Sequence, residues 1–315
     1  MIPVAMFVYN RLDNTQKTIE HLLANTLASQ TDVFVFSDGG KTLPNGTPDN
    51  GSWNAVNSVR SYLHKVKEEI DNSHSFNSFT IVERDKNIYL EANITTGIQQ
   101  IFEHYDRVIV LEDDICTSPY YLEYMNSAFE MYKDVPKIMH VSGFTNLSLS
   151  DRECYFTPHM SGWGWGTWRD RWQKHFVHYG SREQALEGMN QADMDAMQYG
   201  GVFPCLKSLD KSPIPWDICW EIAIYKAGGL CLTPGRTLVR NVGLKNGTHF
   251  RSFDILQRYE FDREPSATPI HLEKVSNPEK NAETEALFAD AIKDWGIRYT
   301  LLGKIVRYFY KKYVK

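Results

Sequence analysis

Short apolar segments alternate with longer segments of helical spacing through residues 1–145, and this alternation constrains the fold most strongly. The apolar segments have the length and β-branched content of buried strands. They span 2–9, 32–37, 79–84, 107–111 and 138–142, and helices are predicted near 53–70, 92–105 and 119–132. The capping-box spacing of Asp13 and Gln16 predicts that Asp13 caps a first helix. Because strands that alternate with helices form βαβ units, we predict an α/β fold with a mainly parallel central sheet flanked by helices.

Three consecutive carboxylates, Glu112, Asp113 and Asp114, directly follow the predicted buried strand at 107–111. At the end of a buried strand they would repel one another and cost stability unless a cation or hydrogen-bond donors compensate. Ligands of open α/β sheets bind at the carboxyl ends of strands, and Mg²⁺ or Mn²⁺ takes oxygen ligands and commonly bridges to a substrate phosphate. The triplet therefore indicates a metal–diphosphate site, with a solvated acidic turn or helix N-terminus as the alternative.

Composition narrows the class of protein. Of 315 residues, 42% are hydrophobic and 23% charged, as in a soluble globular protein, and the net charge of −5 gives no reason to expect nucleic acid as a partner. The aromatic content of 13% is high and suits the binding of sugars or bases, although packing alone can also use aromatic residues. The five cysteines include no CxxC pair, which fits a reducing cytosol. No signal peptide or membrane-spanning stretch is recognised, so a cytoplasmic location is expected.

The second half of the chain is less regular. It contains a Gly/Trp cluster at 161–168, a polar helical stretch at 182–199 and an apolar strand at 230–233. The pair Trp216-Asp217 precedes a further helix, where Asp217 could be an N-cap, a site carboxylate or both. Residues 303–315 carry five basic and no acidic residues among aromatic ones. They predict a short basic amphipathic helix, which could lie on an anionic membrane or dock on its own domain.

Taken together, these motifs form an ordered set. It comprises Tyr9-Asn10-Arg11, Ser37-Asp38-Gly39-Gly40, a helix with Asn93, the acidic triplet, Gly162-Trp163-Gly164-Trp165, Trp216-Asp217 and Thr248-His249. The set resembles the GT-A class of nucleotide-sugar glycosyltransferases over residues 1 to about 255, and it is most similar to the N-acetylglucosaminyltransferase I-like family. The resemblance implies a GT-A (Rossmann-like) fold. Residues 1–145 would bind the nucleotide-sugar, 146–260 would form the acceptor-side half of the same domain, and 261–315 would form a C-terminal extension.

The resemblance also implies roles for residues of the first half. Arg11 would lie near the diphosphate, Asp38 would bind uridine, and Asp114 would hold Mn²⁺ or Mg²⁺ directly. Glu112 and Asp113 would bind ribose or sugar hydroxyls or act through water. Asn93 stands where the family has a nucleotide-contacting histidine, so this chain departs from the pattern there.

In the second half, the resemblance implies that Asp217 is the catalytic base and that Trp216 lies beside the sugar. Glu221, one helical turn later, is the alternative base. The sugar pocket would include Gly162, Trp163, Gly164 and Trp165, while Thr248 and His249 would close over the diphosphate.

These expectations describe a metal-dependent, inverting glycosyltransferase with a UDP-sugar donor, for which UDP-N-acetylglucosamine is the first choice. The acceptor would be a saccharide or lipid-linked saccharide, as in bacterial surface-polysaccharide assembly, with the C-terminus as a possible contact to the inner membrane face. The alternatives are a sugar-phosphate nucleotidylyltransferase and a non-catalytic saccharide-binding protein of the same fold. A nucleotidylyltransferase would require a Gly-rich loop after the first strand, but the segment Tyr9-Asn10-Arg11-Leu12-Asp13 contains no glycine.

Overall fold

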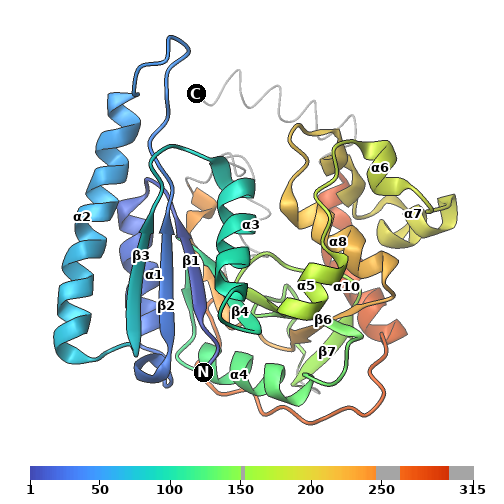
Figure 1. The fold of residues 1–315 in the computed structure, drawn as a ribbon. Coiled ribbons are helices and arrows are strands. Elements are labelled where there is room, and N and C mark those ends of the chain that lie inside the picture. Colours follow the sequence, from blue (N-terminus) through green and yellow to red (C-terminus); the bar gives the residue numbers. More distant parts are fainter. Residues whose placement is uncertain (150–152, 246–262, 298–315) are drawn as a thin grey trace, which may run out of the picture.

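The computed structural model describes residues 1–149, 153–245 and 263–297 (Figure 1). Within these ranges, eight strands form one mixed sheet in the order β3-β2-β1-β4-β8-β6-β9-β7. The strands are β1 (Val4–Val8), β2 (Asp32–Ser37), β3 (Ser78–Glu83), β4 (Arg107–Glu112), β6 (Ile138–Ser142), β7 (Cys154–Thr157), β8 (Trp165–Trp168) and β9 (Leu230–Pro234). A second, small sheet pairs β5 (Ile115–Thr117) with β10 (Val239–Asn241).

The sheet is mainly parallel, as predicted. β3, β2, β1 and β4 pair in parallel, and β6 pairs with β9 in parallel, whereas β8 and β7 are antiparallel to their neighbours. Because β8 comes from the second half of the chain and lies between β4 and β6, the two predicted halves share one continuous sheet. The carboxyl ends of β1, β2 and β4 consequently lie side by side at one edge.

Helices cover both faces of the sheet (Figure 1). They are α1 (Leu12–Leu23), α2 (Asn50–Ser73), α3 (Tyr89–Phe102), α4 (Tyr121–Met131), α5 (Arg169–His175), α6 (Arg182–Leu186), α7 (Gln191–Met197), α8 (Trp216–Lys226) and α10 (Ala282–Ile297). Short 3₁₀ turns occupy Ala28–Gln30, Tyr199–Gly201, Cys205–Asp210 and Val242–Lys245.

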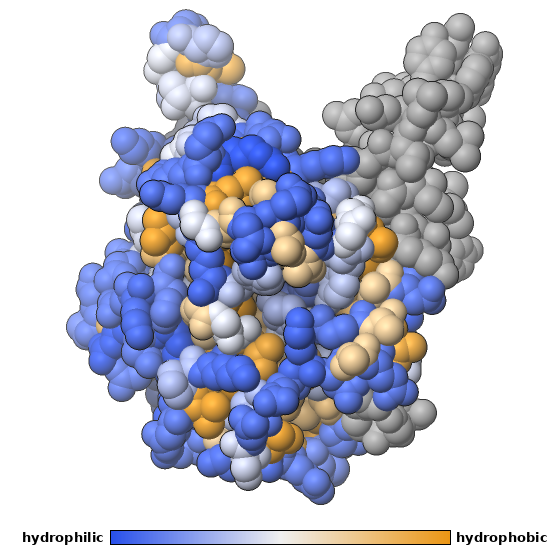
Figure 2. Space-filling model, turned by 90° about the vertical axis from the view of Figure 1, so that its right-hand side faces the viewer, coloured by the Kyte–Doolittle hydropathy of each residue, from blue (hydrophilic) through white to orange (hydrophobic). Residues whose placement is uncertain are grey.

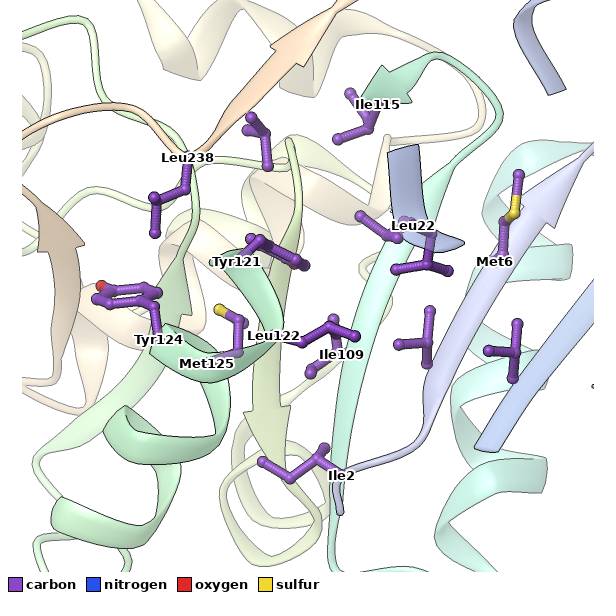
Figure 3. Close-up of a cluster of buried hydrophobic side chains, with 14 of the residues drawn as sticks. Ile2, Met6, Leu22, Ile109, Ile115, Tyr121, Leu122, Tyr124, Met125 and Leu238 are labelled. Atoms are coloured by element: carbon purple, nitrogen blue, oxygen red, sulfur yellow. The ribbon is translucent and has the colours of Figure 1, made fainter. Parts of the chain in front are cut away.

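Alternating side chains of the strands build two separate cores. Val4, Met6 and Val8 of β1 pack with buried residues of α1, α2 and α4, and Figure 3 shows part of this cluster around Leu22, Ile109 and Leu122. Ala5 and Phe7 point to the other face and pack with residues of α3, α5 and α8. A strand buried on both faces explains why these segments are continuously apolar in the sequence.

Several local predictions were wrong. Asp13 does not cap α1, because Arg11 occupies the N-cap position and no side chain makes a capping hydrogen bond there. The predicted helix at 182–199 is broken into α6 and α7, since Gly188 adopts a φ of +79° and Asn190 starts α7 with a capping box. The Gly/Trp cluster contains strand β8, which was not predicted.

The C-terminal part packs on the body of the domain as far as it is described. Ile270 joins the core beneath α4, and Phe288 of α10 packs against the buried cluster of Leu147, Leu149 and Tyr155. Within the described ranges, no helix has both the length and the apolar character needed to cross a bilayer. Figure 2 shows one face, on which the hydrophobic residues with a described placement are scattered among hydrophilic ones. The predicted basic helix at 303–315 lies outside the described residues, as do Thr248 and His249.

Candidate active site

A cavity of about 610 Å³ lies at the carboxyl edge of the parallel strands. Its volume falls within the range of roughly 300–1,000 Å³ that is typical of small-molecule sites. Both halves of the chain contribute to its wall. The lining residues are Phe7, Val8, Tyr9, Asn10, Arg11, Asp38, Lys41, Asn87, Tyr89, Leu90, Asn93, Glu112, Asp113, Asp114, Gly162, Trp163, Trp216, Asp217, Asn241 and Gly243.

The acidic triplet forms one corner of this cavity. Phe7 of β1 is in register with Glu112 of β4, so the residues that follow these two strands meet at the edge of the sheet. Arg11 donates from Nε to Asp113 Oδ2 at 3.2 Å and from Nη2 to Asp113 Oδ1. Its Nη1 lies 2.8 Å from Asp114 Oδ2. One guanidinium therefore holds two of the three carboxylates in a fixed arrangement.

The single positive charge of Arg11 does not neutralise the three carboxylates of this corner. Burial raises the pKa of Asp113 to about 6, although the charge of Arg11 opposes the rise. Burial also raises the pKa of Glu112 well above its usual value, and the charges of Asp114, Asp113 and Asp217 raise it further. The pKa of Arg11 is raised, because the two aspartates outweigh the opposing effect of its burial. A further positive charge at this corner would favour the ionised carboxylates.

Asn241 and Gly243 complete the corner, and sequence reasoning missed both. β10 pairs with β5, which directly follows the triplet, and the Val242 amide donates to the Asp114 carbonyl at 2.8 Å. A Cβ at position 243 would collide with Asp114 Oδ2 and lie 2.9 Å from Arg11 Nη1. A side chain at position 243 would therefore force the side chains of this ion pair to shift.

Asp38 lies at the end of β2 with its carboxylate held by backbone amides. Oδ1 accepts hydrogen bonds from the amides of Gly39 at 2.8 Å and Ile88 at 2.9 Å. Burial raises the pKa of Asp38, while these amides and that of Tyr89 oppose the rise. The side chain of Asp38 thereby ties the end of β2 to the start of α3.

Asn93 lines the cavity from α3, and its amide also has partners inside the protein. Nδ2 donates to the carbonyl of Phe36 at 3.3 Å, and Oδ1 accepts from Arg84 Nε at 3.2 Å. Asn93 thus links the cavity wall to the carboxyl end of β2.

The opposite wall comes from the start of α8 and the residues before β8. Pro215 occupies the N-cap position of α8, so the alternative of Asp217 as N-cap was wrong. Asp217 lies in the first turn, accepts from the Ile218 amide at 2.7 Å and lines the cavity. Asp217 and the acidic triplet line the same cavity, and the charge of Asp217 adds to the raised pKa of Glu112. Trp216 lines the cavity beside Asp217.

The segment Gly162-Trp163-Gly164-Trp165 lies partly in the cavity wall and partly in the core. Gly162 and Trp163 line the cavity, whereas Gly164 and Trp165 do not. Trp165 is fully buried and stacks on Trp216 with ring centroids 5.0 Å apart. The expectation that Gly164 and Trp165 line the sugar pocket was therefore wrong, because β8 begins at Trp165 and turns its indole into the core.

Glu221 lies outside the cavity lining. Its Oε1 is 2.5 Å from Nδ1 of His159, and its Oε2 accepts from the Met160 amide at 2.8 Å. The structure therefore contradicts the alternative of Glu221 as the base, because the side chain is buried and both of its oxygens are engaged, by His159 and by the Met160 amide.

A divalent cation fits the chemistry of the acidic corner, but the protein alone offers few ligands. In the described ranges, no group of three or more His, Cys, Asp or Glu side chains is arranged to hold a metal ion. Mg²⁺ and similar ions commonly use one or two carboxylates together with substrate phosphates and water. Asp114 satisfies that pattern at the cavity wall.

No family model and no curated protein matches the chain. Among solved structures, the mannosyltransferase PcManGT from Pyrobaculum calidifontis, in complex with GDP-Man and Mn²⁺, is similar with 11% identity and a TM-score of 0.40, over 72% of this chain and 73% of that chain. Residues 1–349 of S. aureus TarS give 10% identity and a TM-score of 0.36, over 55% of this chain and about half (49%) of that one. A UDP-glucose pyrophosphorylase complexed with UDP-glucose gives 11% identity and a TM-score of 0.40, over 74% of this chain and 91% of that chain. Likeness at this level leaves the function to be argued from the geometry of the chain itself.

Proposed function

We propose that the protein is a glycosyltransferase that moves a sugar from a nucleoside-diphosphate donor to an acceptor hydroxyl. The observation that carries this proposal is the position of Asp217. A carboxylate from the second half of the chain lines the same cavity as the acidic triplet and Arg11, and its charge is felt by Glu112. A site of this kind combines groups for a diphosphate with a separate proton acceptor.

The first half supplies the donor groups. Arg11 lies at the end of β1 and can pair with the leaving diphosphate, and Lys41 adds a second positive charge to the wall. Asp38 is held in place for hydrogen bonds to a nucleoside, for which uridine is our first choice. Asp114 would hold Mn²⁺ or Mg²⁺, and a bound divalent ion would stabilise the negative charge that develops on the diphosphate.

The second half supplies the proton acceptor. In the proposed transfer, the acceptor oxygen forms a bond to the anomeric carbon while the bond to the diphosphate oxygen breaks. Asp217 takes the proton of the acceptor hydroxyl, and the electron pair of the broken bond leaves with the nucleoside diphosphate. One such base on the face opposite the leaving group suffices for inversion, and UDP-N-acetylglucosamine is the donor we propose to test first.

Calorimetric titration with UDP and Mn²⁺, combined with the release of UDP from UDP-N-acetylglucosamine, tests these roles. Asp114→Asn should lose most of the Mn²⁺-dependent affinity for UDP. Asp217→Asn should keep UDP affinity and lose about 10²–10⁴-fold in the rate of UDP release. Glu68→Gln, an exposed position on α2, serves as the matched control. Failure of the parent protein to bind UDP with Mn²⁺ would overturn the choice of uridine, and failure with GDP, ADP, CDP and dTDP as well would overturn the proposal. Pyrophosphate release from UTP and a sugar 1-phosphate would favour the nucleotidylyltransferase.

A further inference from the structure

A second cavity, of about 430 Å³, adjoins the start of α3. It is lined by Ile88, Tyr89, Glu91, Ala92, Thr95, His178 and Pro213. Tyr89 lines both this cavity and the larger one, so the two spaces meet at this side chain. None of the roles assigned above uses the second cavity.

Tyr89 has an unusual conformation for its residue type. Its φ is +64°, in the left-handed region that bulky side chains rarely adopt, and 66% of the residue is exposed. The preceding amide, that of Ile88, donates to the Asp38 carboxylate at 2.9 Å. The site that holds Asp38 therefore also holds the turn that presents an aromatic ring to solvent. Backbone strain that the surrounding structure maintains is common at ligand-binding sites.

The second cavity also lies close to the proposed base. Pro213 is four residues before Asp217, just ahead of the N-terminus of α8. Asp217 lines the larger cavity, which adjoins the second cavity at Tyr89, and Pro213 lines the second cavity.

The lining residues suit a ring that has one apolar face and a rim of hydroxyls. Tyr89, Ile88, Ala92 and Pro213 offer apolar surface, and Glu91 and His178 offer polar side chains. The hydroxyl of Thr95 donates to the carbonyl of Glu91 at 2.7 Å, which leaves its oxygen free to accept. A stacked aromatic ring with a few polar groups beside it is a common arrangement for orienting amphipathic ligands.

We propose that the second cavity is the subsite for a saccharide acceptor, whose ring stacks on Tyr89 and whose hydroxyls bind Glu91 and His178. This inference rests on the proposed function, because it needs Asp217 to receive the proton of the acceptor hydroxyl. It adds the substrate class of the acceptor and the place where the acceptor binds.

Saturation-transfer NMR with UDP and diamagnetic Mg²⁺ present tests the subsite, with the octyl β-glycosides of glucose, galactose and N-acetylglucosamine as probes below micelle-forming concentrations. Ring protons of at least one probe should receive saturation from the parent protein. Tyr89→Phe should preserve this signal, whereas Tyr89→Ala and the cavity-filling Ala92→Trp should abolish it. Gln99→Trp, at an exposed position of the same helix outside both cavities, is the matched control and should leave the signal intact.

Three results would contradict the subsite. In the first, no probe shows saturation of its ring protons. In the second, only the alkyl protons are saturated, which would indicate a lipid ligand, and in the third, Ala92→Trp gives the same signal as the parent. The affinity for UDP with Mg²⁺, measured in the same samples, separates this failure from that of the proposed function. Failure of the parent to bind UDP or any of the other nucleoside diphosphates contradicts the glycosyltransferase, whereas retained UDP binding without a ring signal contradicts the acceptor subsite alone.

Discussion

His159 and Glu221 form a buried pair that joins the loop before β8 to α8. Nδ1 of His159 lies 2.5 Å from Oε1 of Glu221, and the two side chains are 3% and 6% exposed. Oε2 of Glu221 also accepts from the Met160 amide, and the chain then continues to Gly162 and Trp163 in the cavity wall. Glu221 therefore connects the helix that carries Asp217 to the loop on the same side of the cavity.

We expect Glu221→Ala to lower the free energy of unfolding by about 3 kcal/mol, because it leaves the buried His159 side chain and the half-buried Met160 amide without their acceptor. Glu221→Gln keeps an oxygen acceptor, so it should cost about 1 kcal/mol and change the rate of UDP release little. Urea denaturation and the UDP-release assay measure these effects. A stable Glu221→Gln variant with a rate reduced as strongly as that of Asp217→Asn would return the role of base to Glu221.

The positions of Arg11, Asp38 and the acidic triplet could be predicted from the sequence for a simple reason. Each lies at the end of a parallel strand or within three residues of it, and parallel strands bring their carboxyl ends to one edge. The strand at 107–111 was recognisable because it is buried on both faces and so continuously apolar.

Other parts of the site depend on contacts that leave no local signal. Trp163 and Trp165 are both tryptophans next to glycines, so the sequence does not distinguish them. Trp163 lines the cavity, whereas Trp165 begins β8 and faces the core. Asn241 and Gly243 reach the triplet through the pairing of β10 with β5, over more than 100 residues of chain. Glu221 lies four residues after Asp217, a rise of about 6 Å along α8, and it does not line the cavity.

Gly243→Ala should weaken the Mn²⁺-dependent binding of UDP about 10–100-fold. The added methyl group must displace Asp114 and Arg11, both of which it would contact too closely. Titration of UDP with and without Mn²⁺ measures the effect. Gly51→Ala is the matched control, because a Cβ there meets only Asp49 Oδ1, at 3.4 Å. Unchanged affinity in Gly243→Ala would mean that the metal binds away from Asp114.

His140 should make the protein less stable as the pH falls. Its imidazole is buried and stacks on Trp165 with ring centroids 5.1 Å apart, and burial lowers its pKa to about 3. In the unfolded chain its pKa is about 6.5, so between these values the unfolded state binds a proton that the folded state does not. Above about pH 6.5 the imidazole is neutral in both states and has no such effect. As the pH falls from there towards 3, the free energy of unfolding decreases by about 1.4 kcal/mol per pH unit.

The variant His140→Phe keeps an aromatic ring against Trp165 but has no proton to bind. Between pH 7.5 and 5, the parent should lose about 2 kcal/mol more of its unfolding free energy than this variant does. Urea denaturation at the two pH values measures the difference, and His104→Phe, at an exposed position, controls for loss of a histidine as such. An equal loss in parent and His140→Phe would show that the buried imidazole is protonated in the folded protein.

Tyr89→Gly should make the protein more stable while removing the proposed acceptor contact. Glycine adopts a φ of +64° without steric strain, whereas tyrosine pays roughly 1–2 kcal/mol for it, and the exposed ring contributes little burial. After the larger chain entropy of glycine is subtracted, we expect a gain of about 0.5–1 kcal/mol. Tyr89→Ala keeps the Cβ and hence the strain, so it should show no such gain. A destabilised Tyr89→Gly would mean that the ring is held by packing, and the turn would then no longer indicate a backbone strained for ligand binding.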